Sequence, residues 1–302
     1  MAKRKHKSPV SPLKRGITIS ALVLLIVLAS VYCIVAYRKT GTLFPTRELF
    51  DGLPTLHFVD VGQGDCTLVT YKGDTVLIDA GTVGRGMTTA EYVRMYAPVV
   101  DYFIITHPHE DHMGGAPFVF DAVKVENLVL STDTVMDEFY IETLALAYEE
   151  GTNIIYLDDA AKFQVGEISI TILDTFGVEY DDLNDASMIT RIDVPGTSLL
   201  ITGDAEKAAE VYALEHNDLA LLDCDILKAG HHGSSTSTTD DFLAAVSPEI
   251  CVISCGRNNS YGHPSSEVVT RIEEYGAVIH RTDTEGTVIL RGKKQSSYNY
   301  TK

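Results

Sequence analysis

A short segment rich in metal-ligating side chains constrains the fold of this chain more than any other feature. The apolar run 102–105 is typical of a buried β-strand, and the residues that follow place His107, His109, Asp111 and His112 within six positions. Imidazole and carboxylate groups are ligands that suit zinc and neighbouring divalent metals. In an extended loop His107 and His109 can point the same way, whereas Asp111 and His112 turn toward a second position. A polar loop with chance histidines is the alternative, but this density of donors favours a metal site that could feed two adjacent ions.

Two later segments end in a similar way. The apolar run 199–202 is followed by Gly203 and Asp204, and the run 226–229 leads to Gly230, His231 and His232. An aspartate in the position of Asp204 is more often the N-cap of the following helix. Because a histidine-rich strand end lies elsewhere in the same chain, we expect Asp204 to be a metal ligand.

Short β-rich runs alternate with helical segments from residue 55 onward. Such a pattern predicts two sheets, each covered by helices. The expected strands are 55–61, 66–71, 75–79, 101–106, 127–131, 153–157, 167–173, 188–194, 197–202, 225–228, 249–254, 278–281 and 286–290. The expected helices are 87–97, 135–150, 205–216, 239–246 and 265–275.

The N-terminal part of the chain has a different character. Residues 17–37 are 21 consecutive residues without a charge, which as a helix reach roughly 31 Å and could cross a bilayer. A cleaved signal peptide is the main alternative; a buried core helix is disfavoured because the stretch has no polar face. We expect a basic cytosolic tail (1–16), a transmembrane anchor (17–37), a linker (38–54) and one large domain (55–302). Six basic residues precede the span and two follow it, which predicts a single-pass membrane protein with an extracellular domain.

Charge and cysteine content narrow the class of protein. The chain has 24 basic and 42 acidic residues, and the part after residue 39 carries a net charge of −26. A purely electrostatic nucleic-acid binder is therefore unexpected, and no stable nucleic-acid-binding surface is evident. The five cysteines include no closely spaced pair, which favours buried thiols over a disulfide framework, although export leaves room for one bridge.

The motifs together resemble a known family. The segment 107–112 (HPHEDH) resembles the signature of the metallo-β-lactamase fold. The segments FVDVGQGD (58–65), LIDAG (77–81), LKAGHHGS (227–234) and YGHP (261–264) are similar to the C-terminal hydrolase domain of ComEC-type competence proteins, which are associated with DNA uptake. The resemblance extends from about Thr55 to Leu290 and implies an α/β fold, the αββα sandwich of two mixed sheets flanked by helices.

The resemblance also implies roles for particular residues. It places His107 and His109 on one metal, Asp111 and His112 on a second, and Asp204 as a bridge. His232 would complete the second site, His231 would lie near a substrate oxygen, and Asp79 would orient the histidine loop. The expected cofactor is one or two zinc ions, with manganese as the alternative. One departure concerns the first site, because no histidine occurs between His112 and His216 where the fold usually has its third; Asn184 and Ser187 partly match the ComEC-type pattern there.

The expected function is that of an outward-facing, metal-dependent phosphodiesterase or nuclease that acts on DNA or related phosphodiesters through a metal-activated hydroxide. Asp111, His231 and His263 are its expected catalytic residues, His231 or His263 protonating the leaving oxygen. Cell-wall polymer phosphoesters are the alternative substrate, and a non-catalytic, metal-stabilised binding module is the alternative class. For Asp60, Gln63 and Asp65 the sequence leaves open a functional role or simple satisfaction of a glycine-rich turn. No protein partner is predicted.

Overall fold

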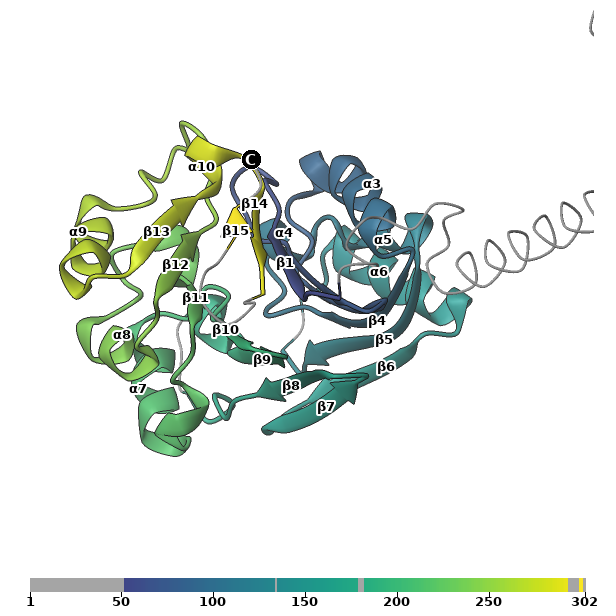
Figure 1. The fold of residues 1–302 in the computed structure, drawn as a ribbon. Coiled ribbons are helices and arrows are strands. Elements are labelled where there is room, and N and C mark those ends of the chain that lie inside the picture. The colour runs from purple at the N-terminus through teal and green to yellow at the C-terminus, as the bar shows by residue number, and fades with distance from the viewer. Residues whose placement is uncertain (1–51, 134, 179–181, 293–298, 301–302) are drawn as a thin grey trace, which may run out of the picture. The chain divides into compact units, whose positions relative to one another are not determined.

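The part of the chain from residue 52 onward is built from two β-sheets packed face to face, with helices on both outer surfaces (Figure 1). The computed structural model describes residues 52–133, 135–178, 182–292 and 299–300. The predicted tail and anchor lie outside these residues, as does most of the predicted linker. Within the described part of the chain no helix is both long and apolar enough to span a bilayer.

The first sheet has eight strands in the order β15-β14-β1-β2-β3-β4-β5-β6. Its strands are β1 (Thr55–Phe58), β2 (Thr67–Tyr71), β3 (Asp74–Ile78), β4 (Val99–Ile104), β5 (Lys124–Ser131), β6 (Asn153–Leu157), β14 (Val288–Arg291) and β15 (Asn299–Tyr300). Strands β3 to β6 run parallel to one another, whereas the other neighbours pair antiparallel. The sheet is therefore mixed.

The second sheet has seven strands in the order β13-β12-β11-β10-β9-β8-β7. They are β7 (Ala161–Val165), β8 (Ile168–Ile172), β9 (Thr190–Val194), β10 (Thr197–Ile201), β11 (Ile226–Lys228), β12 (Ile250–Ile253) and β13 (Val278–Arg281). Here β10 to β13 run parallel to one another, and the neighbours from β7 to β10 pair antiparallel. Both sheets are therefore mixed, each with four neighbouring parallel strands.

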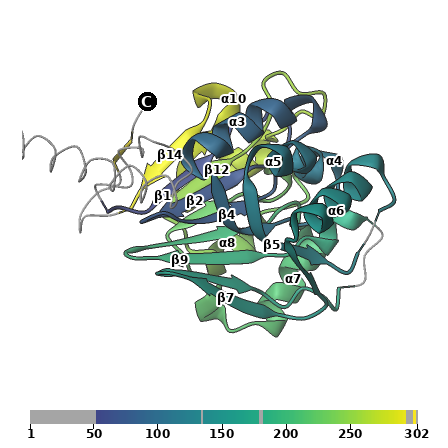
Figure 2. The same ribbon diagram turned by 90° about the vertical axis from the view of Figure 1, so that its right-hand side faces the viewer.

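Helices cover the two outer faces, as Figures 1 and 2 show. The first sheet is covered by α3 (Gly86–Tyr96), α5 (Ala116–Ala122) and α6 (Glu138–Glu150), and the second by α7 (Lys207–His216), α8 (Asp240–Val246) and α9 (Ser266–Tyr275). Two single-turn helices, α4 (Glu110–Met113) and α10 (Thr282–Glu285), follow strands of the first and second sheet respectively.

Three layers of apolar side chains hold the sandwich together. In β4, Phe103 faces the helices that cover its own sheet, whereas Ile104 faces the other sheet. In β10, Leu200 likewise faces the covering helices and Leu199 faces the other sheet. This alternation buries both faces of each central strand. The four cysteines of the described part are free and buried, as the sequence predicts; they are Cys66, Cys224, Cys251 and Cys255.

Every strand and helix expected from the sequence has a counterpart, and within the described residues the structure adds three α-helices and two strands that were not predicted, besides four 3-10 turns. Three are single turns or a two-residue strand: α4, α10 and β15. Helix α5 was missed because its seven residues are almost all apolar and include Pro117 in the first turn, so they show no helical periodicity. Strand β7 was missed because it is a half-exposed edge strand with no continuous apolar run.

Candidate metal centre

The side chains singled out from the sequence come together beyond the carboxyl ends of three strands. Strand β4 leads through a short loop into α4, strand β10 is followed by Asp204, and strand β11 is followed by the 3-10 turn η4 (Gly230–Gly233). One of these strands belongs to the first sheet and two belong to the second. The centre is therefore assembled from both halves of the sandwich.

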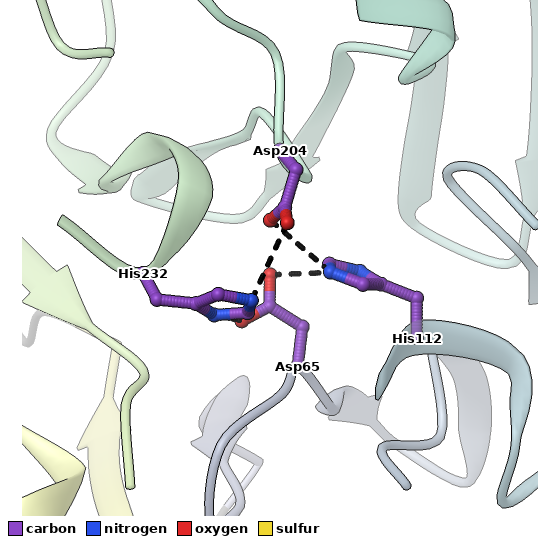
Figure 3. Close-up of side chains that lie close together, drawn as sticks. All are labelled: Asp65, His112, Asp204 and His232. Atoms are coloured by element: carbon purple, nitrogen blue, oxygen red, sulfur yellow. Dashed lines mark ion pairs between the residues drawn. The ribbon is translucent and has the colours of Figure 1, made fainter. Parts of the chain in front are cut away.

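Four buried side chains form the middle of this centre: Asp65, His112, Asp204 and His232. One potential ligand atom from each lies within 4.8 Å of all the others, and Figure 3 shows the four side chains pointing toward one another. The Nε2 atom of His112 is 3.1 Å from Asp204 Oδ1, and that of His232 is 3.4 Å from Asp204 Oδ2. The side chains thus form a compact set of two imidazoles and two carboxylates.

Hydrogen bonds on the far side of each imidazole set its orientation. His112 Nδ1 donates to Asp79 Oδ2 at 2.8 Å, and His232 Nδ1 donates to the Ser254 carbonyl oxygen at 3.0 Å. Asp79 also accepts hydrogen bonds from the backbone and the hydroxyl of Thr106, both at 2.8 Å. With Nδ1 used in this way, the Nε2 lone pairs of both neutral rings face the centre, as metal ligands require. Asp79 has the orienting position that the resemblance implied.

The histidine pair on η4 occupies unusual backbone conformations. His231 has φ 46° and ψ 49°, and His232 has φ 54° and ψ 22°. Residues other than glycine rarely adopt this left-handed backbone conformation. Hydrogen bonds from His231 N to Gly203 O and from Gly230 N to Thr238 Oγ1, both at 3.1 Å, hold the turn in place. Such conformations concentrate at functional sites, where the surrounding structure imposes them.

The middle of the centre contains buried polar atoms that receive no hydrogen bond within the described residues. They are Oδ1 of Asp65, Nε2 of His112 and Oδ1 of Asp204, whereas Oδ2 of Asp65 forms an ion pair with Lys228. Buried polar atoms without hydrogen bonds are rare, and each calls for an explanation. Three such atoms within one buried group, all of them possible nitrogen or oxygen ligands, fit a divalent cation.

Electrostatics point to the same conclusion. Burial lowers the pKa of His112, but the carboxylates of Asp204 and Asp79 outweigh it and hold that pKa well above its usual value. His232 behaves in the same way beside Asp204 and Asp65. Burial raises the pKa of the Asp204 carboxyl, yet the two imidazoles keep it well below its usual range. The carboxylates therefore favour positive charge at this place, which a divalent cation held by these residues would supply in place of the imidazole protons.

A second pair of donors adjoins this group. His107 is buried, its ring centroid is 4.2 Å from that of His112, and its Nε2 is 3.0 Å from Nδ1 of His109. Two tetrahedral ligands of one zinc ion are about 3.3 Å apart, so the pair is close to the spacing needed to share an ion. Ser187, one of the residues that partly match the ComEC-type pattern, places its Oγ 3.2 Å from His107 Nδ1 and accepts a hydrogen bond from the Asp204 backbone at 3.0 Å.

The three residues expected to act in catalysis border the group. Asp111 Oδ2 lies 3.1 Å from His232 Nε2. His231 donates from Nδ1 to Glu206 Oε1 at 3.0 Å and places Nε2 3.7 Å from Asp204 Oδ2. The His263 ring is 5.3 Å from that of His231, and its Nδ1 has no hydrogen-bond partner within the described residues. The structure thus brings together all eight residues singled out from the sequence.

Sequence reasoning missed two members of the centre. Asp65 was left undecided, because its sequence context is only a glycine-rich turn. In the structure its backbone N donates to Asp111 O at 3.0 Å, which carries the carboxylate into the centre. Lys228 is fully buried, donates to Gly203 O at 3.0 Å and forms an ion pair with Asp65. A lysine that ends an apolar strand just before paired histidines was the available signal.

The other residues of that turn have structural contacts. Asp60 Oδ1 accepts a hydrogen bond from Gly62 N at 3.1 Å. Gln63 Oε1 accepts one from Gly256 N at 3.0 Å, which ties the β1–β2 turn to the loop that follows β12. Of the three polar residues left undecided in this turn, Asp65 alone lies in the buried group described above.

Fold and site together define a protein class, and a family comparison agrees with them. Residues 59–257 match the family described as the metallo-beta-lactamase superfamily. The chain therefore belongs to the metallo-β-lactamase superfamily, whose fold is associated with metal-dependent hydrolases.

Particular relatives confirm the narrower resemblance. The chain is 28% identical over 256 residues to ComE operon protein 3 of Bacillus subtilis, covering 78% of this chain and 33% of that protein. It is 32% identical over 236 residues to competence protein ComA of Neisseria gonorrhoeae, covering 76% of this chain and 31% of that protein. The chain thus spans about a third of the length of these relatives.

A solved structure supports the fold alone. The metallo-beta-lactamase fold protein YhfI from Bacillus subtilis superposes with a TM-score of 0.52 at 14% sequence identity, and the match covers 79% of this chain and 100% of that one. The αββα sandwich expected from the sequence is confirmed.

Proposed function

We propose that this protein is a metal-dependent phosphodiesterase that cleaves DNA or a related phosphodiester polymer. The observation that carries the proposal is the buried group of Asp65, His112, Asp204 and His232, whose unsatisfied polar atoms face one point. A structural zinc site is usually closed by four ligands, often cysteine. Here the centre continues instead into Asp111, which is 30% exposed, and into the half-buried His231.

The chain's own residues divide into holding and reacting groups. His112, His232, Asp204 and Asp65 would hold one divalent ion, and His107 with His109 would hold a second. When bound, such ions supply Lewis acidity that activates water and offsets charge on phosphate oxygens. Asp204 contacts His112 from the first sheet and His232 from the second, which suits it to join the two histidines on the first ion.

Proton transfer to the leaving oxygen is assigned to His231. Its Nδ1 is held by Glu206 Oε1, so the Nε2 atom is oriented toward the centre, and in the imidazolium form, with both ring nitrogens protonated, it can give up its proton there and leave the neutral ring. Burial, followed by the neighbouring charges of His231 and His232, lowers the pKa of His263. His263 is therefore neutral near pH 7 and is better suited to contact the substrate than to act as an acid.

The substrate class is supported by the relatives, one of which is named a competence protein. Such a name points to DNA, whereas the acidic domain argues against tight, purely electrostatic DNA binding. Cell-wall polymers with phosphodiester links share the reacting group and are the alternative substrate.

The test is hydrolysis of bis(p-nitrophenyl) phosphate by the full chain, first stripped of metal and then supplied with zinc or manganese. We expect turnover only with metal, and a loss of at least 100-fold in Asp111→Asn with the fold retained, since this carboxylate lies beside His232 at the open side. Asp121→Asn, an exposed aspartate on α5, is the matched control. A folded, metal-loaded wild type without turnover on this substrate, on DNA or on wall polymers would refute the proposal.

A metal-stabilised binding module is the second candidate function. Ser187 beside His107, in place of a third histidine, favours it because the first metal position has fewer ligands than the fold usually supplies. The same Asp111→Asn variant separates the two: loss of turnover in a folded protein supports the enzyme, whereas unfolding with no turnover in the wild type supports the module.

We further propose that residues 17–37 anchor the protein as a single-pass membrane span, with the domain from residue 55 outside the cell. The uncharged length of that segment and the basic residues before it support this orientation. Proteinase treatment of intact cells tests it: the domain should be degraded while a tag at the N-terminus stays protected. Protection of both ends would contradict the orientation, and recovery of a shortened chain from the medium would indicate a cleaved signal peptide.

A further inference from the structure

Beside the metal centre lies a cavity of about 350 Å³ that none of the roles above uses. Its lining residues are Asp60, Gly62, Gln63, Arg85, Gly256, Arg257, Asn259 and Asp283. They come from four segments: the β1–β2 turn, the 3-10 turn η1 (Val83–Arg85), the loop after β12, and α10. The size is at the lower end of ordinary ligand pockets, which span about 300–1,000 Å³.

Two arginines in this cavity lack carboxylate partners within the described residues, in contrast to three other arginines of the domain. Arg191, Arg271 and Arg281 each form an ion pair with an aspartate or glutamate. Within the described residues no ion pair joins Arg85 or Arg257 to a carboxylate. Arg85 forms no side-chain hydrogen bond there, and Arg257 uses only Nε, which donates to the Asp283 backbone oxygen at 2.9 Å. The planar guanidinium fork matches phosphate oxygens, so these groups are available for an anion.

The acidic residues of the cavity are already engaged. Asp283 accepts two hydrogen bonds from Arg281, at 3.0 and 2.7 Å, and Asp60 accepts the backbone hydrogen bond from Gly62. When Arg281 is counted, three guanidinium groups accompany the two carboxylates of Asp60 and Asp283, so the net charge at this cavity is positive in a domain with a large excess of acidic residues.

Both arginines stand on segments that are bonded to the metal centre. On one side, Val83 N donates to Glu110 Oε1 at 2.8 Å, which joins η1 to α4, the helix that carries Asp111 and His112. The turn that lines the cavity runs on directly to Asp65.

On the other side, the loop that holds Arg257 also holds the candidate substrate contact. Asn259 Nδ2 donates to the His263 carbonyl oxygen at 2.6 Å, and Asn259 Oδ1 accepts from His263 N at 3.0 Å. The segments that carry both arginines are thus hydrogen-bonded to segments that carry residues of the candidate centre.

We propose that Arg85 and Arg257 form a subsite for a neighbouring phosphate of a polymeric phosphodiester substrate. This inference rests on the proposed function and narrows it, because such a subsite is useful only for a substrate with more than one phosphate. A strand of nucleic acid and a poly(glycerol phosphate) wall polymer both supply that chemistry, and they differ in whether the adjoining unit is a nucleoside.

The experiment compares the full-length chain with its Arg85→Ala and Arg257→Ala variants on three substrates: bis(p-nitrophenyl) phosphate, oligothymidylate and oligo(glycerol phosphate). Arg94→Ala, an exposed arginine near the other end of α3, is the matched control. We expect each variant to lose at least 10-fold in kcat/KM, mainly through KM, on the oligomer that the wild type cleaves best. Turnover of the single phosphodiester should stay within 2-fold. For oligothymidylate the slope of log(kcat/KM) against log salt should fall by about 0.7 per removed contact.

The outcomes separate this inference from the proposed function. Two results with the arginine variants would overturn the subsite: equal losses of activity on all three substrates, or undiminished oligomer cleavage in both variants. A wild type that cleaves bis(p-nitrophenyl) phosphate but neither oligomer would overturn it as well. If the wild type cleaves nothing, the proposed function fails, and binding of fluorescein-labelled oligomers decides the subsite by anisotropy. Binding weakened at least 10-fold by either arginine variant and not by Arg94→Ala supports it; unchanged binding, or no binding, overturns it.

Discussion

At the scale of single residues, Glu210 links the stability of the domain to the histidine turn. Its buried carboxyl accepts hydrogen bonds from the backbones of Thr238 and Thr239, and Thr238 in turn holds Gly230 at the start of η4. Burial raises the pKa of Glu210 to about 7, against the opposing hydrogen bonds and the charge of Arg271. A carboxyl whose pKa is higher in the folded state opposes folding as it ionises, so stability falls as pH rises from about 4.5 to about 7.

Glu210→Gln should remove this dependence, because the amide resembles the protonated carboxyl and does not ionise. Relative to wild type, the variant should gain about 3 kcal/mol in free energy of unfolding between pH 4.5 and 8, as an upper value. Urea unfolding across that range measures the difference. Stability curves that stay parallel for the two proteins would show that Glu210 keeps an ordinary pKa.

At the scale of elements, the β1–β2 turn packs against α4 at a position where only glycine fits. Gly64 has φ 143°, and a Cβ there would lie 2.3 Å from the Asp111 carbonyl oxygen. Gly64→Ala must therefore push the turn away from α4, which displaces Asp65 from the centre. We expect a loss of about 1–3 kcal/mol in stability together with weaker zinc binding, measured by chelator competition.

Gly276→Ala is the control for backbone conformation alone. Gly276 ends α9 with φ 100°, and a Cβ there would meet nothing within 4 Å. This variant should lose stability without any change in zinc affinity. Zinc affinity equal to wild type in Gly64→Ala would show that the fit of this turn on α4 does not position Asp65.

At the scale of the whole domain, the centre joins the two halves of the sandwich. Asp65 and His112 lie on connections of the first sheet, and Asp204 and His232 on connections of the second. A cation that binds only when both halves are in place stabilises the folded domain by mass action, about 2.7 kcal/mol at 100 times its Kd. For a domain of this size that corresponds to a rise in Tm of about 5–10 °C.

Calorimetry of the stripped and zinc-loaded protein tests this expectation. Zinc should raise the Tm of wild type, and His112→Ala should abolish that rise while leaving a folded, metal-free domain. His216→Ala, on the exposed end of α7, is the matched control. A Tm that does not respond to zinc or manganese in wild type would contradict metal binding at this centre.

The local pattern of the sequence determined the elements and most of the site. Apolar runs of four to eight residues predicted the central strands. Metal-ligating residues directly after three of these runs predicted the histidines, Asp111 and Asp204 as site residues, because a ligand at the end of a strand follows the apolar run immediately in the sequence. Strand β7 alternates apolar and polar residues and has no apolar run, and α5 is apolar at every position except Asp121, so the apolar-run pattern that identified the central strands finds neither element.

Only the tertiary structure decided which distant groups share the centre. Asp65 lies in the centre because its turn is hydrogen-bonded to Asp111 in α4. Lys228 lies beside it because the alternation of side chains along β11 points the lysine toward the Asp65 carboxylate. Arg85 and Arg257 are 172 positions apart in the sequence and line one cavity. Local patterns encode secondary structure, whereas proximity across the sandwich depends on how the two sheets pack, which no single segment of the chain specifies.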